Sequence, residues 1–304
     1  MARCPSYERP DNITLTKKET KKMKRISLIL ASAAALAGIS VHADETQNLV
    51  ANGNAADGLT NWSGIQKTVE GGPDGANCFE VTGPTWIFSR EHIAVDPNSE
   101  YQLAGWFKSG NDMPNEVYLG VLPFDENQLP IDALSVNVLE NSETALTAQA
   151  AFGETLIKVN EASAWEPLLD NKQLVIAFDT DDSGEYRDLP NRKTYVVKSL
   201  EKKDGAWEVT LAKPLADEFS AGTKVRAHVK SEHFVYAFQI KKHFAEWTEY
   251  TGTIKPMGKS GAPRNAFWPG TKYVRILLLA NWGQNHGETL QFGNISLKKV
   301  GPQK

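Results

Sequence analysis

The side chains of this chain that are best suited to chemistry are aromatic rings beside polar groups. The 304 residues include eight tryptophans. Three of these lie in segments that could leave an indole exposed, and two of the three, Trp106 and Trp282, have amide or cationic side chains near them in sequence. A flat aromatic ring can pack against the apolar face of a sugar, while neighbouring amides and cations bond its hydroxyls. The candidate ligand-binding residues are therefore Trp106, Trp86, Trp282, Gln102, Lys108 and Asn281.

Trp106 is the first choice among the three indoles. Residues 101–108 alternate as a strand does, which places Trp106 on the face opposite Leu103 and Phe107. Trp86 follows a Gly-Pro-Thr turn, and Trp282 lies in a turn beside several amides. The competing interpretation is that a tryptophan in a β-sandwich fills the core or anchors a loop, and for Trp62 and Trp247 we favour that interpretation.

An acidic loop suggests a second kind of site. Residues 179–185 read Asp-Thr-Asp-Asp-Ser-Gly-Glu, with oxygen-bearing side chains at alternate positions and glycine at the sixth. Pro190 stands where an EF-hand would have its bidentate glutamate. A structural Ca²⁺ held by Asp179, Asp181 and Asp188 is the only cofactor that we predict, and a solvated acidic turn is the alternative.

Signatures of catalysis are missing from the sequence. After residue 43 the five histidines form no His-Glu-x-x-His pair, and there is no Gly-x-Ser-x-Gly motif or phosphate-binding glycine loop. The two carboxylates of a glycoside hydrolase are brought together by the fold, so their positions in the sequence follow no recognisable spacing. We therefore predict no catalytic residues, and a polysaccharide-degrading hydrolase or lyase stays open as an alternative.

The elements that must carry these residues are β-strands. Short apolar or alternating runs recur throughout, separated by Gly, Pro, Asp and Asn, which is typical of an all-β sandwich or barrel. Residues 272–300 resemble a final hairpin whose first strand, 273–280, is apolar enough to be buried on both faces. Residues 234–240 alternate with Phe234, Tyr236, Phe238 and Ile240 on one side. Residues 144–228 form a series of their own, which predicts a small β domain inserted between two strands of the sandwich.

Four segments carry a resemblance to a known family. They are residues 48–53, 101–109, 246–250 and 290–297, and in this order they resemble carbohydrate-binding modules with a galactose-binding-like jelly-roll sandwich, of the type appended to cellulases and xylanases. The resemblance covers 44–143 and 229–304 and implies a non-catalytic module that binds polysaccharide on a sandwich face. It also implies a calcium between the N-terminal loop and the final strand, although Gly293 stands where the family usually has Asp. The insert 144–228 is similar to small β-barrel modules of secreted surface proteins, and cell-surface adhesion is a further alternative.

The N-terminal segment predicts export. A basic stretch at 21–25 precedes 14 apolar residues, and Val41-His42-Ala43 supplies small residues at a cleavage site, so 1–43 are interpreted as a leader with a signal peptide. Removing its 8 basic and 3 acidic residues leaves 25 basic and 34 acidic residues, a net charge of −9. Such an acidic chain is a poor partner for nucleic acid or an anionic membrane. With Cys78 as its single cysteine, the exported chain would depend on its core for stability.

Overall fold

The computed structural model describes residues 47–171, 174–231, 233–283 and 287–300. The leader prediction for 1–43 therefore lies outside the described residues. Residues 45–304 form one compact unit, and its regular structure is nearly all β, as expected. Two antiparallel sheets face each other as a jelly-roll β-sandwich, and a third sheet is built from the inserted segment.

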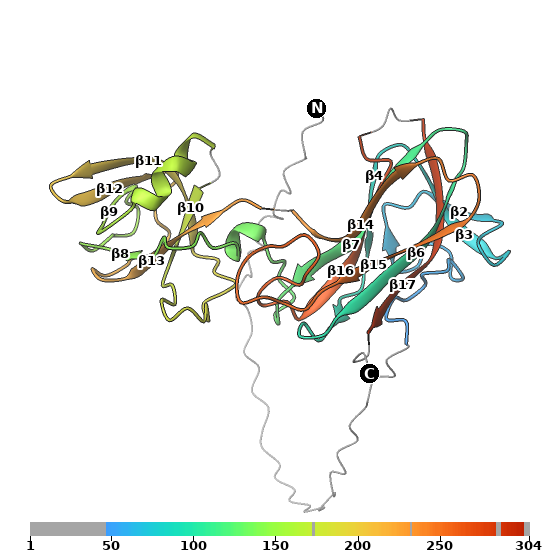
Figure 1. The fold of residues 1–304 in the computed structure, drawn as a ribbon, viewed down its shortest axis with the longest axis horizontal. Coiled ribbons are helices and arrows are strands. Elements are labelled where there is room, and N and C mark those ends of the chain that lie inside the picture. The colour runs from blue at the N-terminus through green and yellow to red at the C-terminus, as the bar shows by residue number, and fades with distance from the viewer. Residues whose placement is uncertain (1–46, 172–173, 232, 284–286, 301–304) are drawn as a thin grey trace, which may run out of the picture. The chain divides into compact units, whose positions relative to one another are not determined.

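The first sheet, sheet A, carries the residues of greatest interest. Its strands follow the order β1-β4-β16-β7-β14, and β5 also pairs with β16 (Figure 1). The bounds are β1 (Trp62–Ser63), β4 (Thr85–Ser89), β5 (Ile93–Ala94), β7 (Asn115–Phe124), β14 (Val235–Lys242) and β16 (Tyr273–Ala280). β16 is central because its run of leucines is buried on both faces, as the sequence predicted.

The second sheet, sheet B, has the order β15-β6-β17-β3-β2. Its strands are β2 (Lys67–Glu70), β3 (Asn77–Thr82), β6 (Tyr101–Ser109), β15 (Thr248–Ile254) and β17 (Thr289–Lys299). On β6, Leu103 and Phe107 are fully buried, whereas Gln102 is exposed and Trp106 is partly buried. The predicted alternation of this strand is therefore confirmed.

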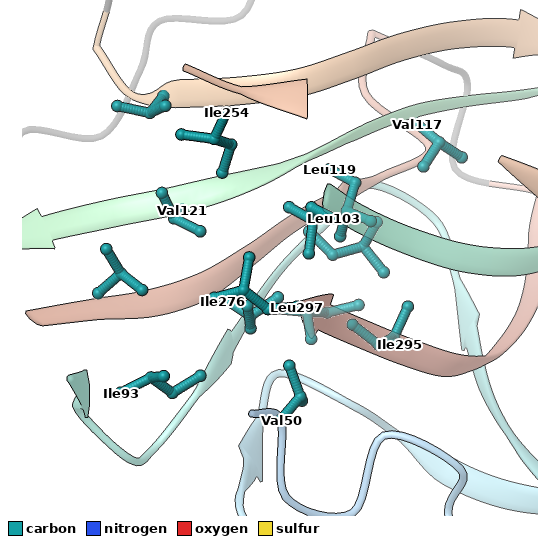
Figure 2. Packing of buried hydrophobic residues seen from close by; sticks show 14 of the residues in the cluster. Val50, Ile93, Leu103, Val117, Leu119, Val121, Ile254, Ile276, Ile295 and Leu297 are labelled. Atoms are coloured by element: carbon teal, nitrogen blue, oxygen red, sulfur yellow. The ribbon is translucent and has the colours of Figure 1, made fainter. Parts of the chain in front are cut away.

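The core lies between sheets A and B. Figure 2 shows aliphatic side chains from the two sheets in contact, including Val117, Leu119 and Ile276 from sheet A with Leu103 and Leu297 from sheet B. All five are fully buried. This cluster contains no residue of the insert, whose own buried cluster includes Trp165, Trp207 and Phe178.

The predicted hairpin over 272–300 is wrong. β16 pairs with β4, β5 and β7 in sheet A, whereas β17 pairs with β3 and β6 in sheet B. The segment between them therefore crosses from one layer of the sandwich to the other. Sequence alone could not separate this crossing from a hairpin, because both consist of two strands joined by a turn.

The inserted sheet has the order β8-β13-β10-β11-β12-β9. Its elements are β8 (Thr144–Ala145), β9 (Leu156–Val159), the 3₁₀ helix η2 (Ser163–Asn171), β10 (Leu174–Phe178), β11 (Thr194–Lys203), β12 (Ala206–Leu211) and β13 (Lys224–Val229). The six strands are paired in a row from β8 to β9, and β8 and β9 do not form a ladder with each other. A single isolated bridge, between Leu146 beside β8 and Val159 of β9, links the two edges of the sheet. Its strands thus form an open, barrel-like sheet rather than a closed barrel.

The two connecting segments of the insert run beside each other. The backbone N–H of Val229 donates to Asn137 over 3.0 Å, and that of Leu139 donates to Ala227 over 2.9 Å. Between these bonds, Val138 forms a bridge with His228. The short 3₁₀ helix η1 (Ala133–Ser135) precedes this pairing. Whether 144–228 is a separately folding domain stays a prediction.

Candidate functional site

The outer face of sheet A holds a continuous group of aromatic side chains. Its floor is formed by Leu277 and Leu279 of β16, which are 0% and 3% exposed although they point away from the core. Rings from four neighbouring segments cover these leucines. We call this group the aromatic face, and it comprises Trp86, Phe88, Tyr118, Phe234, Tyr236 and Trp282.

The rings of the aromatic face form a continuous row in space, each ring in contact with the next. The Trp86 ring centroid lies 5.4 Å from that of Trp282 and 5.3 Å from that of Phe234, both edge to face. Phe234 continues to Tyr236 at 6.0 Å, and Tyr236 to Tyr118 at 5.4 Å. Every ring except that of Tyr236, which is 8% exposed, is partly accessible to solvent. Edge-to-face contacts of this kind hold the rings in place, so the face is pre-organised.

A β-bulge directs two of these rings outward. The pairing of β14 with β7 shifts between Tyr236 and Phe238, so Phe234 and Tyr236 join the aromatic face while Phe238 and Ile240 pack against the core. The prediction that all four share one side is therefore wrong. A bulge inserts one extra residue and reverses the alternation beyond it, which the residue pattern alone does not reveal.

The crossing between the layers supplies Trp282. Its backbone N–H donates to the carbonyl of Glu116 on β7 over 3.1 Å, which fixes the start of the crossing against sheet A. Asn281 precedes it with φ of 57°, a left-handed conformation that asparagine tolerates better than most residues. The indole thereby comes to lie across the edge of Trp86.

Polar side chains adjoin the aromatic rings on the same face. The Glu116 carboxylate accepts hydrogen bonds from the Tyr118 hydroxyl at 3.0 Å and from the Gln239 amide at 3.1 Å. It also forms an ion pair with Lys241 at 3.0 Å. Arg264 donates to the Gln239 side-chain oxygen over 2.8 Å. We call Glu116, Tyr118, Gln239, Lys241 and Arg264 the polar network.

The network sets the ionisation of its acidic members. Burial alone would raise the pKa of Glu116, but the bonds from Lys241, Tyr118 and Gln239 outweigh it and lower that pKa. Burial and the neighbouring Glu116 carboxylate raise the pKa of the Tyr118 hydroxyl. At neutral pH the network therefore offers one carboxylate, one neutral phenol, one amide and two cations. Rings flanked by such groups can stack on a sugar and bond its hydroxyls.

The structure separates the sequence-predicted binding residues into two groups. Trp86 and Trp282 meet on the aromatic face. Trp106, Gln102 and Lys108 lie on β6 in sheet B. Asn281 is fully buried, and its amide bonds the carbonyls of Gly83 and Glu288 while its oxygen accepts from Asn115. Asn281 is thus positioned to support the crossing and is shielded from solvent, contrary to its predicted contact with a ligand.

The acidic loop of the insert does not gather its carboxylates. Asp181 accepts backbone N–H groups from Ser183 and Arg187, Asp188 is paired with the buried Arg226 at 2.7 Å, and Asp179 is paired with Lys193 at 2.8 Å. Nowhere in the described ranges do three or more His, Cys, Asp or Glu side chains form a group fit for a metal. The three carboxylates are thus each bonded to groups of the protein, and a structural Ca²⁺ held by Asp179, Asp181 and Asp188 stays a prediction.

Several residues of the site were missed from the sequence. They are Tyr118, Phe234, Tyr236, Glu116, Gln239, Lys241 and Arg264. The alternation through 234–240 was a usable signal for Phe234 and Tyr236. The sequence contains no such signal for Glu116 or Arg264. Glu116 comes to the site through the pairing of β7 with β14, and Arg264 comes from a loop that lies 148 residues further along the chain.

Comparisons with known proteins give a fold-level likeness. No family model and no curated protein sequence matches the chain. Similar solved structures are mostly carbohydrate-binding modules. One is the CBM22-1 xylan-binding domain of a Paenibacillus barcinonensis protein, at 8% identity and a TM-score of 0.34, covering 82% of this chain and 93% of that one. Another is a CBM61 in complex with β-1,4-galactotriose, at 9% identity and a TM-score of 0.33, covering 84% and 100%.

A third similar structure joins such a module to a catalytic one. It is the CBM22-1 and GH10 portion of an endo-1,4-β-D-xylanase from Clostridium thermocellum, at 9% identity and a TM-score of 0.35. It covers 81% of this chain, and the chain spans 27% of it. At these TM-scores the likeness has no bearing on ligand or activity. None of the helices within the described ranges has the length and apolar character that crossing a membrane requires.

Proposed function

We propose that this chain binds carbohydrate through the aromatic face of sheet A. The observation that carries the proposal is the partly exposed row Trp282–Trp86–Phe234, backed by buried leucines and by Tyr236, with the polar network beside it. Rings fixed by neighbouring rings lose little entropy on binding a flat sugar face. The binding surface thus differs from the one predicted around Trp106.

The composition of the site supports the non-catalytic part of this proposal. Among the residues of the aromatic face and the polar network, Glu116 is the single carboxylate, and three side chains bond it. Glycoside hydrolysis generally uses two carboxyl groups, one of which must change its protonation state. A glutamate held ionised by an adjacent lysine is poorly suited to donate a proton.

The test compares single tryptophan variants on a panel of soluble polysaccharides by affinity electrophoresis. Trp86→Ala and Trp282→Ala should each weaken binding at least about tenfold, because each removes one ring of the stacking surface. Trp106→Ala is the matched control, since it removes a partly buried indole from sheet B.

Two results would overturn the proposal. One is a wild-type protein that no polysaccharide retards, and the other is a loss of binding with Trp106→Ala that equals the loss with Trp86→Ala. Assays of reducing ends and unsaturated products on the same polymers test the enzymatic alternative, and product release by the wild type would replace the binding role with catalysis.

Adhesion through the insert is a second candidate function, because the insert exposes apolar side chains. Phe152, Leu156 and Val196 are 73%, 46% and 47% exposed. A contiguous patch of exposed apolar side chains often marks a contact surface, and these three side chains are the candidates for one on the insert. A Phe152→Ser variant with reduced attachment to whole cells but unchanged glycan binding would favour this role.

Export is part of the proposal, since polysaccharides lie outside the cell. Cleavage after Ala43 would produce a protein that begins at Asp44. N-terminal sequencing of the protein from the periplasm or the culture medium tests this expectation, and an intact leader on all of the recovered protein would contradict it.

A further inference from the structure

Arg264 is held in one place on the aromatic face. The carbonyl of Arg264 accepts the backbone N–H of Tyr236 over 2.6 Å, which ties its loop to β14. Its guanidinium lies 5.4 Å from the Tyr236 ring centroid and donates one hydrogen bond to Gln239. An arginine fixed at both its backbone and its head group is pre-organised, so binding a ligand costs it little side-chain entropy.

Within the part of the chain that the structure describes, Arg264 forms no ion pair with a carboxylate. Glu116, the carboxylate of the polar network, is paired with Lys241 at 3.0 Å, and its side chain is only 12% exposed. The guanidinium of Arg264 contacts the Tyr236 ring and the Gln239 amide, which are both neutral.

The exposed guanidinium also has donors to spare. Arginine carries five N–H groups in a planar fork, and the bond to Gln239 uses one of them. The fork matches the two oxygens of a carboxylate, and such a pair is among the stronger hydrogen-bonded contacts in water-exposed sites. The site is therefore locally cationic, although the chain carries 37 acidic residues against 33 basic ones.

We infer that the aromatic face selects glycans that carry carboxylate groups, with Arg264 bonding a uronic acid beside sugar rings stacked on the partly exposed Phe234 and Trp86. This inference rests on the proposed carbohydrate-binding function and adds the chemical class of the ligand. It differs from the neutral ligand that the acidic composition of the chain favours. The aromatic rings supply affinity for sugars in general, and Arg264 supplies the preference for an acidic one.

The test uses polysaccharides that differ only in charge. Polygalacturonate, glucuronoxylan and alginate are each compared before and after reduction of their carboxyl groups to alcohols, with dextran sulfate and dextran as a further pair. Binding is measured by isothermal titration calorimetry or affinity electrophoresis at two salt concentrations. At least one carboxylated polymer should bind about tenfold more tightly than its reduced form, and the difference should shrink at high salt.

Two substitutions connect that difference to Arg264. Arg264→Gln should weaken binding of the carboxylated polymer far more than binding of its reduced form, so that the two affinities become equal. Arg264→Lys keeps the charge but loses the planar fork, so it should restore only part of the preference. Arg187→Gln is the matched control, because it removes an exposed arginine of the insert and changes the net charge equally.

Each outcome is decisive. Equal affinity for carboxylated and reduced polymers overturns the inference while the proposed function stands, as does a preference that Arg264→Gln leaves intact. Binding of dextran sulfate in preference to every carboxylated polymer shows that sulfate is the recognised group and also overturns the inference. Failure to bind any polysaccharide, charged or neutral, overturns the proposed function itself.

Discussion

Gly120 and Tyr236 lie against each other where β7 meets the bulge of β14. A Cβ atom placed on Gly120 would be 2.1 Å from the carbonyl oxygen of Val235 and 2.9 Å from the Cα of Tyr236. Both of these neighbours are backbone atoms, which cannot move aside as a flexible side chain can. The bulge that turns Phe234 and Tyr236 outward therefore depends on a residue without a side chain.

Gly120→Ala should consequently damage both stability and the binding face. Overpacking of this kind typically costs about 1–3 kcal/mol of unfolding free energy, and displacement of β14 should also weaken glycan binding. Urea denaturation and the polysaccharide panel measure the two effects. Gly258→Ala is the control, because the nearest atom to its new Cβ would be 3.4 Å away, and a similar loss in that variant would contradict the explanation.

Asn281 should matter for stability rather than for contact with a ligand. Asn281→Ala removes one hydrogen-bond partner from each of the Gly83 carbonyl, the Glu288 carbonyl and the Asn115 amide, and it places alanine at φ of 57°. The loss should be about 2–4 kcal/mol. Asn281→Gly removes the same bonds without the backbone strain, so it should be less destabilising in chemical denaturation; equal losses would show that strain is unimportant.

His228 should make the stability of the chain depend on pH. Its Nδ1–H donates to the Leu134 carbonyl over 2.8 Å, so Nε2 is the unprotonated nitrogen that faces Arg226 at 3.3 Å. Burial and the Arg226 charge lower the pKa of His228 from 6.5 to about 4, although Asp188 opposes the shift.

Because the folded state resists protonation of His228, the unfolded chain binds more protons between the two pKa values. The stabilisation is complete above pH 6.5 and is lost as the pH falls towards 4, by about 3 kcal/mol in total. Urea titrations at several pH values on the wild type and His228→Gln measure the difference between the two slopes. Parallel slopes in the two proteins over this interval would rule out this role.

Cys78 should be inert in the native protein. It is fully buried, and burial together with the Glu80 carboxylate raises the pKa of its thiol to about 11. In the protein that begins at Asp44, a thiol reagent at pH 8 should label Cys78 very slowly in buffer and at once in 6–8 M urea, where the chain is unfolded. Rapid labelling in buffer would indicate that β3 opens readily.

The sequence predicted what depends on local pattern and missed what depends on partners. Alternation along 101–108 correctly separated Leu103 and Phe107 from Trp106, because the period of a strand is a local property. The leucines of 273–280 correctly indicated a strand buried on both faces. Neither pattern says which strand pairs with which, so β16 and β17 were placed in one hairpin although they belong to different sheets.

In the candidate site, too, local patterns are predictable from the sequence and contacts between distant residues are not. Trp86 and Trp282 were selected because their neighbours are turn residues, and the structure brings them together. Trp106 is the first candidate from the sequence, but it lies on sheet B, whereas the further aromatic rings gather on the outer face of sheet A. Which outer face gathers the rings depends on the order of the strands in each sheet, which a local pattern does not give. The contacts of Glu116 with Lys241 and of Arg264 with Gln239 join residues far apart in sequence, which residue types alone cannot pair.

The paired backbone segments at Asn137 and Val229 have a consequence for how such a chain could change over time. Because the chain leaves the sandwich and returns to it at adjacent positions, a tight turn could replace everything between them, with the loss of contacts such as the ion pair of Arg192 with Asp125. Genetic exchange of this segment could therefore change the surface of the insert while the aromatic face is inherited unaltered.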